Sequence, residues 1–317
     1  MGDSLVIQTQ GLGKVYGDVV ALRSLDLAVP RQAICGFLGP NGAGKTTAMK
    51  LLLGLSRPTS GRGAIFGLDI GRDSLTIRER VGYLPQQPSF YETLTARETL
   101  RFTAGLFFSG SRAGIDAKVD EMLALVGLTE CADRPVRGFS GGEKQRLGIA
   151  QAQINDPELL ILDEPAAALD PLGRRDVLAI MERLRERTTI FYSTHILNDV
   201  QQVSDTVVIL NRGELVTQGP IEALLMGDGH AVYSVVVGGE TEAARESLAR
   251  QRWVAGIVTG EQNGRLEWKV SVSDPAAAEE QLLRVVLAHP GVTVSAFNRR
   301  RFDLEEIFVN LVEGGQL

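Results

Sequence analysis

The sequence predicts an α/β domain followed by a small α+β domain. From residue 5 to about residue 225, short apolar runs alternate with longer segments of helical periodicity, the pattern of strands that feed helices. A run of glycine and polar residues at 226–231 interrupts this pattern. Beyond it, the segments approximate a β-α-β-β-α-β unit. We therefore expect domains at 1–225 and 226–317, and the 317 residues suffice for two separate cores.

The first domain is expected to combine buried strands with a helical insert. The apolar runs that predict buried strands are Ala33–Leu38, Leu159–Leu162 and Thr189–Thr194. Between about 92 and 137, helical signals replace the strand signals. In this stretch Thr95 and Glu98 have the spacing of a capping box. One face of a second helix is expected to carry Val119, Met122, Leu123 and Val126.

The tail alternates strand and helix signals. In chain order, we expect a strand at Ala231–Val237, a helix at Thr241–Gln251, a strand at Leu266–Val272, a helix at about 275–288, a strand at Val292–Phe297 and a helix at Leu304–Val312. No second copy of any motif is visible.

Composition excludes several classes of function. The formal net charge of −6 and the pI near 5.3 disfavour non-specific nucleic-acid binding. No stretch approaches the roughly 20 uncharged apolar residues of a membrane-spanning helix. The opening residues Met1–Ser4 lack the positive charge of a secretory signal, so we expect a cytoplasmic protein. Cys35 and Cys131 are too far apart to suggest a zinc site, and we expect both to be buried packing residues.

A phosphate-binding loop is the strongest motif of the chain. Residues 39–46 fit the pattern G-x-x-x-x-G-K-[ST] between an apolar strand and a helix that begins near Thr46. Glycines let backbone N–H groups surround phosphates, Lys45 can reach the β- and γ-phosphates, and Thr46 can bind Mg²⁺. The residues expected to hold the nucleotide are Gly39, Pro40, Asn41, Gly42, Ala43, Gly44, Lys45, Thr46 and Thr47.

Two adjacent carboxylates follow the apolar strand at Leu159–Leu162. Open α/β sheets bind ligands at the carboxyl ends of their strands. Asp163 would hold Mg²⁺, directly or through water, and Glu164 would act on the attacking water. Taken alone, the pair is equally consistent with a solvated acidic strand end.

A second helix start carries Ser140, Gly141 and Gly142. Ser140 and Glu143 form the spacing of a capping box, and the two glycines permit close approach to the backbone. Since one phosphate loop is already present, we expect this helix start to serve a nucleotide bound to a partner molecule. An ordinary capped helix is the alternative.

The order of these motifs resembles the ATP-binding cassette (ABC) family, from residue 5 to about 225. The resemblance implies a phosphate-loop ATPase core with an antiparallel β subdomain and the helical insert. It also implies that Tyr16 stacks on adenine and that Gln86 senses both Mg²⁺ and the attacking water. Asp170 would lie at a dimer interface, and His195 would contact the γ-phosphate. Taken individually, Tyr16 could be a surface aromatic and Gln86 a loop residue. Asp170 could be a turn residue and His195 a structural histidine.

The resemblance also implies a mechanism and partners. Two copies would meet head to tail, most simply as a homodimer, with each ATP between one phosphate loop and the other copy's Ser140 and Gly142. ATP hydrolysis would drive a separate membrane permease at the cytoplasmic face of the cell membrane, without nucleic acid. The chain departs from the family pattern at Arg31-Gln32, Phe139 and Ala166–Ala168, and none of these positions supplies a catalytic group.

The tail indicates a branch of the family. Residues Asn298–Phe308 resemble the terminal helix of bacterial ATPases that pair with type-2 export permeases. One alternative is a non-transport ABC ATPase of the translation or DNA-repair type. Another is an importer ATPase with a regulatory tail, for which the tail should be an all-β barrel. The sequence does not specify the cargo.

Overall fold

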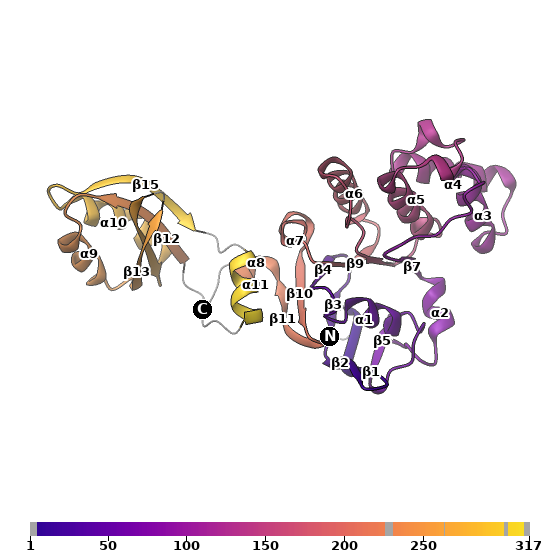
Figure 1. The fold of residues 1–317 in the computed structure, drawn as a ribbon, viewed down its shortest axis with the longest axis horizontal. Helices are drawn as coiled ribbons and strands as arrows, with labels where there is room; N and C mark the ends of the chain where they lie inside the picture. Colours follow the sequence, from indigo (N-terminus) through magenta and orange to yellow (C-terminus); the bar gives the residue numbers. More distant parts are fainter. Residues whose placement is uncertain (1–4, 226–230, 263, 301–303, 314–317) are drawn as a thin grey trace. The chain divides into compact units, whose positions relative to one another are not determined.

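The chain divides into two compact units, Met1–Ile221 and Glu222–Leu317. The computed structural model describes residues 5–225, 231–262, 264–300 and 304–313 (Figure 1). The division falls four residues before the expected domain end at 225, inside a short helix, α8 (Ile221–Leu225).

The first unit alternates strands and helices along its sequence. Its strands are β1 (Leu5–Tyr16), β2 (Val19–Leu25), β3 (Ala28–Pro30), β4 (Ile34–Leu38), β5 (Ser60–Ile65), β6 (Leu68–Asp69), β7 (Val81–Leu84), β8 (Leu159–Asp163), β9 (Thr189–Thr194), β10 (Thr206–Asn211) and β11 (Glu214–Pro220). Its helices are α1 (Lys45–Leu52), α2 (Ser74–Glu79), α3 (Ala96–Phe107), α4 (Arg112–Leu125), α5 (Gly141–Gln153), α6 (Pro171–Leu184) and α7 (Leu197–Val203), with short 3₁₀ turns at Thr129–Cys131 and Val136–Gly138.

A mixed sheet runs through this unit. Among the described residues it has eleven strands in the order β6-β5-β1-β2-β11-β10-β4-β9-β8-β7, with β3 paired to β1. From β10 to β7 all neighbours are parallel, whereas β1, β2, β5 and β6 pair antiparallel. Every residue of β4, β8 and β9 is buried, as expected for strands covered on both faces. Phe37 and Phe191 stack across the β4–β9 pair with ring centroids 5.1 Å apart.

Helices cover both faces of the parallel strands. Helix α1 contacts β2, β5 and β8, while α7 contacts β4 and β9 and α5 contacts β7 and β8. The three strands predicted from apolar runs all form, within one residue of the expected bounds at each end. The predicted helix near Thr46 begins one residue earlier, at Lys45.

The expected helical insert consists of α3, α4 and the 3₁₀ turns that precede α5. Thr95 caps α3 in the predicted capping box with Glu98. On α4 and just beyond it, Val119, Met122, Leu123 and Val126 are all buried.

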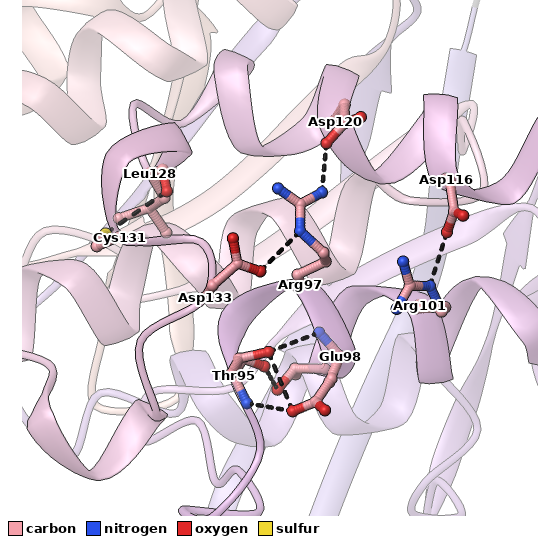
Figure 2. A network of polar contacts seen from close by, with 10 residues as sticks. Thr95, Arg97, Glu98, Arg101, Asp116, Asp120, Leu128, Cys131 and Asp133 are labelled. Atoms are coloured by element: carbon pink, nitrogen blue, oxygen red, sulfur yellow. Dashed lines mark hydrogen bonds and ion pairs between the residues drawn. The ribbon is translucent and has the colours of Figure 1, made fainter. Parts of the chain in front are cut away.

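Arginine ion pairs join the two helices of the insert. Figure 2 shows Arg97 of α3 bound to Asp120 of α4 and to Asp133, whose Oδ1 lies 2.9 Å from Nε. One turn further along, Arg101 Nε donates to Asp116 Oδ1 at 2.7 Å. These pairs fix the spacing of α3 and α4, while α5 packs against both helices (Figure 1).

The expectation that both cysteines are buried was half correct. Cys35, in the fully buried strand β4, is covered, and this burial raises the pKa of its thiol to about 12. Cys131 is only partly buried, because the turn at Thr129–Cys131 lies at the surface of the insert, where its thiol contacts the carbonyl oxygen of Leu128 (Figure 2).

The second unit is a two-layer α+β fold. Its described elements are β12 (Ala231–Gly238), α9 (Glu242–Ala249), β13 (Val254–Gln262), β14 (Arg265–Val272), α10 (Pro275–Leu287), β15 (Thr293–Arg300) and α11 (Leu304–Glu313). The four strands form an antiparallel sheet in the order β13-β14-β12-β15. Helices α9 and α10 pack against each other and cover one face of this sheet (Figure 1). The β-α-β-β-α-β order is the predicted one, and β13 is the strand that no sequence segment had indicated separately.

The core of the second unit depends on Trp268, which is 0% exposed on β14. We predict that Trp268→Ala lowers the free energy of unfolding of this unit by about 3–5 kcal/mol, because the substitution leaves a cavity beneath α9 and α10. Hydrogen exchange of the β12 and β14 amides measures the loss. Leu287→Ala, at the exposed end of α10, is the control and should change stability by less than about 0.5 kcal/mol. Unchanged protection in Trp268→Ala would contradict this view of the core.

Candidate active site

The loop between β4 and α1 adopts a conformation that glycine permits. Gly44 has φ 106°, and a Cβ on it would lie 2.6 Å from the carbonyl oxygen of Ala21. A Cβ on Gly39 would lie 2.4 Å from the carbonyl oxygen of Leu210. Both positions therefore require glycine on steric grounds. Pro40, Asn41 and Gly42 of this loop are exposed, Ala43 is buried and Thr47 is half-buried on α1.

Lys45 lies buried at the start of α1. Its Nζ donates to the carbonyl oxygens of Gly39 at 2.6 Å and Pro40 at 3.2 Å. Nζ also lies 3.4 Å from Glu164 Oε1, and both side chains are about 5% exposed. The ammonium group is thus held over the loop, where phosphate oxygens can replace its carbonyl partners.

A chain of hydrogen bonds connects α1, β8 and β9. Thr46 Oγ1 donates to Asp163 Oδ2 at 2.8 Å. Ser193 Oγ donates to the other oxygen of the same carboxylate, Oδ1, at 2.6 Å and accepts from the backbone N–H of Glu164 at 2.8 Å. Asp163 and Ser193 are both buried. Hence both oxygens of the Asp163 carboxylate have fixed partners.

Glu164 and His195 are in contact next to this chain of hydrogen bonds. Glu164 follows β8 with φ 52°, a left-handed conformation that is rare outside glycine, and its side chain is 5% exposed. His195 Nδ1 lies 2.9 Å from Glu164 Oε2, and the ring is 44% exposed. Glu164 thus contacts Lys45 through one oxygen and His195 through the other.

Charged and phenolic groups surround these residues. Asp199 of α7 is buried and bound to Arg174 of α6, and burial raises the pKa of its carboxyl despite that arginine. Burial, with the neighbouring charge of Asp163, raises the pKa of Tyr83 to about 12. Tyr83 therefore stays neutral at physiological pH.

The remaining predicted site residues lie at the surface. Tyr16 is 47% exposed at the end of β1, with Lys14 Nζ 4.7 Å from its ring centroid, and Gln86 is exposed after β7. Ser140 caps α5 in the predicted capping box with Glu143, and Asp170 caps α6 by accepting from Gly173. Ser140 and Gly141 are exposed, and Gly142 is half-buried.

The predicted site residues therefore fall into two sets in the structure. Lys45, Thr46, Asp163, Glu164 and His195 form one connected cluster. Among the described residues, no hydrogen bond joins this cluster to Tyr16, Gln86, Ser140, Gly142 or Asp170. Sequence reasoning missed Ser193, whose available signal was its position near the end of β9, two residues before His195.

Comparisons with known proteins place this chain in a family. A sequence model described as "ABC transporter" matches residues 22–167. The uncharacterised ABC transporter ATP-binding protein YxlF of Bacillus subtilis is 36% identical over 97% of this chain and 99% of its own length. The chain belongs to the ABC transporter ATP-binding proteins. Within that family it is of the exporter-like type and is an ATPase.

Two further relatives have more informative names. The bacitracin transport ATP-binding protein BcrA of Bacillus licheniformis is 43% identical over 70% of this chain and 72% of its own. The daunorubicin resistance ATP-binding protein DrrA3 of Streptomyces coeruleorubidus is 34% identical over 96% and 95%.

Solved structures of ABC cassettes share the fold. CbiO1 of Clostridium perfringens, part of the transporter complex CbiONQ, aligns with a TM-score of 0.65 at 26% identity over 78% of this chain and 96% of its own. A dimeric cassette in a post-hydrolysis state bound to ADP and Pi aligns with a TM-score of 0.62 at 25% identity over 68% and 98%. In the described part of this ABC ATPase, no helix is long and apolar enough to cross a bilayer.

Glu164→Gln should separate nucleotide binding from turnover. The amide keeps the shape of the side chain but cannot accept a proton, so we predict that turnover falls about 10²–10⁴-fold while ATP affinity is retained. Phosphate release and equilibrium nucleotide binding measure the two effects. Glu158→Gln, on the exposed Arg80 ion pair, is the control. A Glu164→Gln protein with the wild-type turnover rate would refute the proton-accepting role.

Lys45→Ala should weaken binding itself. The loss of a charged donor to the phosphates is expected to cost about 1.5–3 kcal/mol, or roughly a 10–100-fold higher Kd for ATP. The measurement is a binding titration without hydrolysis. Lys50→Ala removes an exposed lysine from the same helix and should leave the affinity unchanged. Equal affinities in the two variants would argue against contact between Lys45 and phosphate.

Proposed function

We propose that this ABC ATPase binds Mg-ATP, dimerises around two ATP molecules and drives a separate membrane permease in export. One observation carries the proposal. Lys45, Thr46, Asp163, Glu164 and His195 are held in contact at the carboxyl ends of neighbouring parallel strands, where such sheets bind ligands.

The donor groups suit Mg²⁺. In phosphate sites this ion takes one or two protein oxygens together with the phosphates of the substrate. The Thr46 hydroxyl and the Asp163 carboxylate, 2.8 Å apart, supply two such oxygens. Mg²⁺, when bound there, would neutralise charge on the β- and γ-phosphates.

The chain's own residues would perform the remaining chemistry. Lys45 and the backbone N–H groups of residues 41–46 bind the phosphates. Glu164 Oε accepts the proton of the attacking water, and His195, on the exposed side of Glu164, orients the γ-phosphate. Tyr16, exposed at the end of β1, offers its ring to the adenine, and Gln86 contacts Mg²⁺ and water at the edge of the site.

A second copy would complete each site. Ser140, Gly141 and Asp170 are exposed at helix starts that make no hydrogen bond to this chain's own cluster. The free N–H groups at the start of α5 would bind the γ-phosphate of a nucleotide held by the other copy. A dimeric arrangement of related cassettes supports this proposal.

The helical insert provides a surface for the permease. Large apolar side chains gather on α3 and beside it, and those of Tyr91, Phe102, Leu106, Phe107 and Phe108 are all at least 37% exposed. Tyr91 and Phe102 make an edge-to-face contact with centroids 6.2 Å apart. Large exposed apolar side chains that lie close together, as Tyr91 and Phe102 do, support a protein contact on this part of the insert. We infer that the chain is peripheral, on the cytoplasmic face of the cell membrane.

Export is the favoured direction because of the relatives and the tail. BcrA and DrrA3 carry names that refer to bacitracin transport and daunorubicin resistance. The second unit has helices on its sheet and is not the all-β barrel expected of the importer alternative. The tail resemblance at Asn298–Phe308 includes residues 301–303, which lie outside the described residues. A non-transport ABC ATPase is the second candidate.

The test is to identify the partner. Tagged Glu164→Gln protein is purified from its native cells with Mg-ATP in mild detergent, and mass spectrometry identifies what accompanies it. We expect a multi-span membrane protein in stoichiometric amount. The double change Phe102→Ser and Leu106→Ser should release this partner without loss of ATP binding. Ribosomal or DNA-repair proteins in its place would refute the transport proposal.

Ser140→Arg should prevent ATP-driven dimerisation. Arginine at this helix start would place a bulky side chain against the other copy's nucleotide, while each monomer stays folded. Sedimentation with ATP, in the Glu164→Gln background, measures the dimer. Ser111→Arg is a matched control, because Ser111 caps α4 by accepting from the N–H of Gly114 at another exposed helix start. Dimerisation of the Ser140→Arg protein would reject this role of α5.

A further inference from the structure

Ser193 is a buried hydroxyl in contact with both carboxylate-bearing residues of the site. It is 0% exposed on β9. Its Oγ donates to Asp163 Oδ1 at 2.6 Å and accepts from the N–H of Glu164 at 2.8 Å. Both hydrogen-bonding capacities of the hydroxyl are thus used within the site, and none is used to hold the strand ladder.

The register of the sheet explains this double contact. Strands β8 and β9 are parallel, and Ser193 lies opposite Asp163. His195 comes directly after β9, which ends at Thr194. Ser193 contacts Asp163, and His195 contacts Glu164 at 2.9 Å. Ser193 near the end of β9 and His195 just after it therefore contact two successive acidic residues, one at the end of β8 and one just after it.

The contact with Asp163 determines how this carboxylate is oriented. Since Ser193 binds Oδ1, the second oxygen, Oδ2, faces Thr46 at 2.8 Å. A carboxylate without this partner can rotate about its terminal bond, which has a broad torsional preference. Without the Ser193 hydroxyl, the Asp163 carboxylate would therefore be free to rotate, and its Oδ2 would no longer be held toward Thr46.

The contact with Glu164 stabilises an unusual backbone. Glu164 has φ 52°, and its N–H would be buried without a partner if the Ser193 hydroxyl were absent. The backbone conformation of Glu164 sets where its carboxylate meets Lys45 and His195.

We propose that Ser193 is a positioning residue for ATP hydrolysis, which orients Asp163 for the divalent cation and Glu164 for the attacking water. The inference rests on the roles given to Asp163 and Glu164 in the proposed function. It assigns Ser193 no contact with the nucleotide. Residues that orient metal-binding groups affect metal affinity or activity by about 10–100-fold when removed.

The experiment measures cation binding apart from turnover. Mn²⁺ is titrated by electron paramagnetic resonance into the full chain with a non-hydrolysable ATP analogue. The variants are Ser193→Ala, Ser193→Thr, which keeps the hydroxyl, and Ser193→Cys, which keeps the size with a weaker donor. Analogue binding in EDTA shows that each variant is folded, and Ser193→Cys serves as the test if Ser193→Ala does not fold. Ser204→Ala is the matched control, because Ser204 is a buried serine bound to Tyr192 OH at 2.9 Å.

We expect Ser193→Ala to raise the Kd for Mn²⁺ about 10–100-fold and to lower kcat with Mg-ATP. Analogue binding in EDTA should be unchanged, Ser193→Thr should restore both properties, and Ser204→Ala should match the wild type. A wild-type Mn²⁺ affinity in Ser193→Ala, or equal losses in Ser193→Ala and Ser193→Thr, would overturn the inference.

Asp163→Asn separates this inference from the proposed function. If Asp163→Asn weakens Mn²⁺ binding and Ser193→Ala does not, only the role of Ser193 fails. If neither change affects Mn²⁺ binding, the assignment of Asp163 to the cation fails as well.

Discussion

The parallel register of β4, β9 and β8 is the constraint on which the site depends. These neighbouring strands end at the same edge of the sheet, and each delivers a different group there. β4 leads into the phosphate loop and Lys45, β8 ends in Asp163 followed by Glu164, and β9 carries Ser193 and is followed by His195. A shift of one residue between β8 and β9 would turn Ser193 away from Asp163.

The same arrangement brings several features that cost folding free energy together at the site. Lys45 and Glu164 are charged and almost fully buried, and such pairs gain little net stability because both charges lose water. The left-handed backbone of Glu164 costs a further ~1–3 kcal/mol. The fully buried strands around the site and the contacts of Ser193 and His195 offset these costs. The result is a set of charged groups already oriented before substrate arrives, which is how enzymes stabilise developing charge.

The parts of the fold that could be predicted from sequence depend on local signals. Apolar runs predicted β4, β8 and β9, and the spacing of Ser140 with Glu143 and of Thr95 with Glu98 predicted both capping boxes. The phosphate loop is likewise a continuous segment. Ser193 could not be found in this way, because its importance arises from strand register, which joins residues 30 positions apart. Strand β13 was not indicated separately, since its glycines and polar residues interrupt the alternation.

Ser140 was predicted to begin a helix and does cap α5, but the role proposed for it involves a molecule outside the chain. In the described part of the chain no hydrogen bond joins Ser140 to Lys45, which fits the proposal that each site is shared between two copies. The direct test mixes a Lys45→Ala copy with a Ser140→Arg copy and measures ATP hydrolysis. One complete site forms in the mixed dimer, and we predict turnover well above the sum of the two proteins measured separately. Turnover equal to that sum, under conditions in which the wild-type chain is active, would contradict a site shared between two copies.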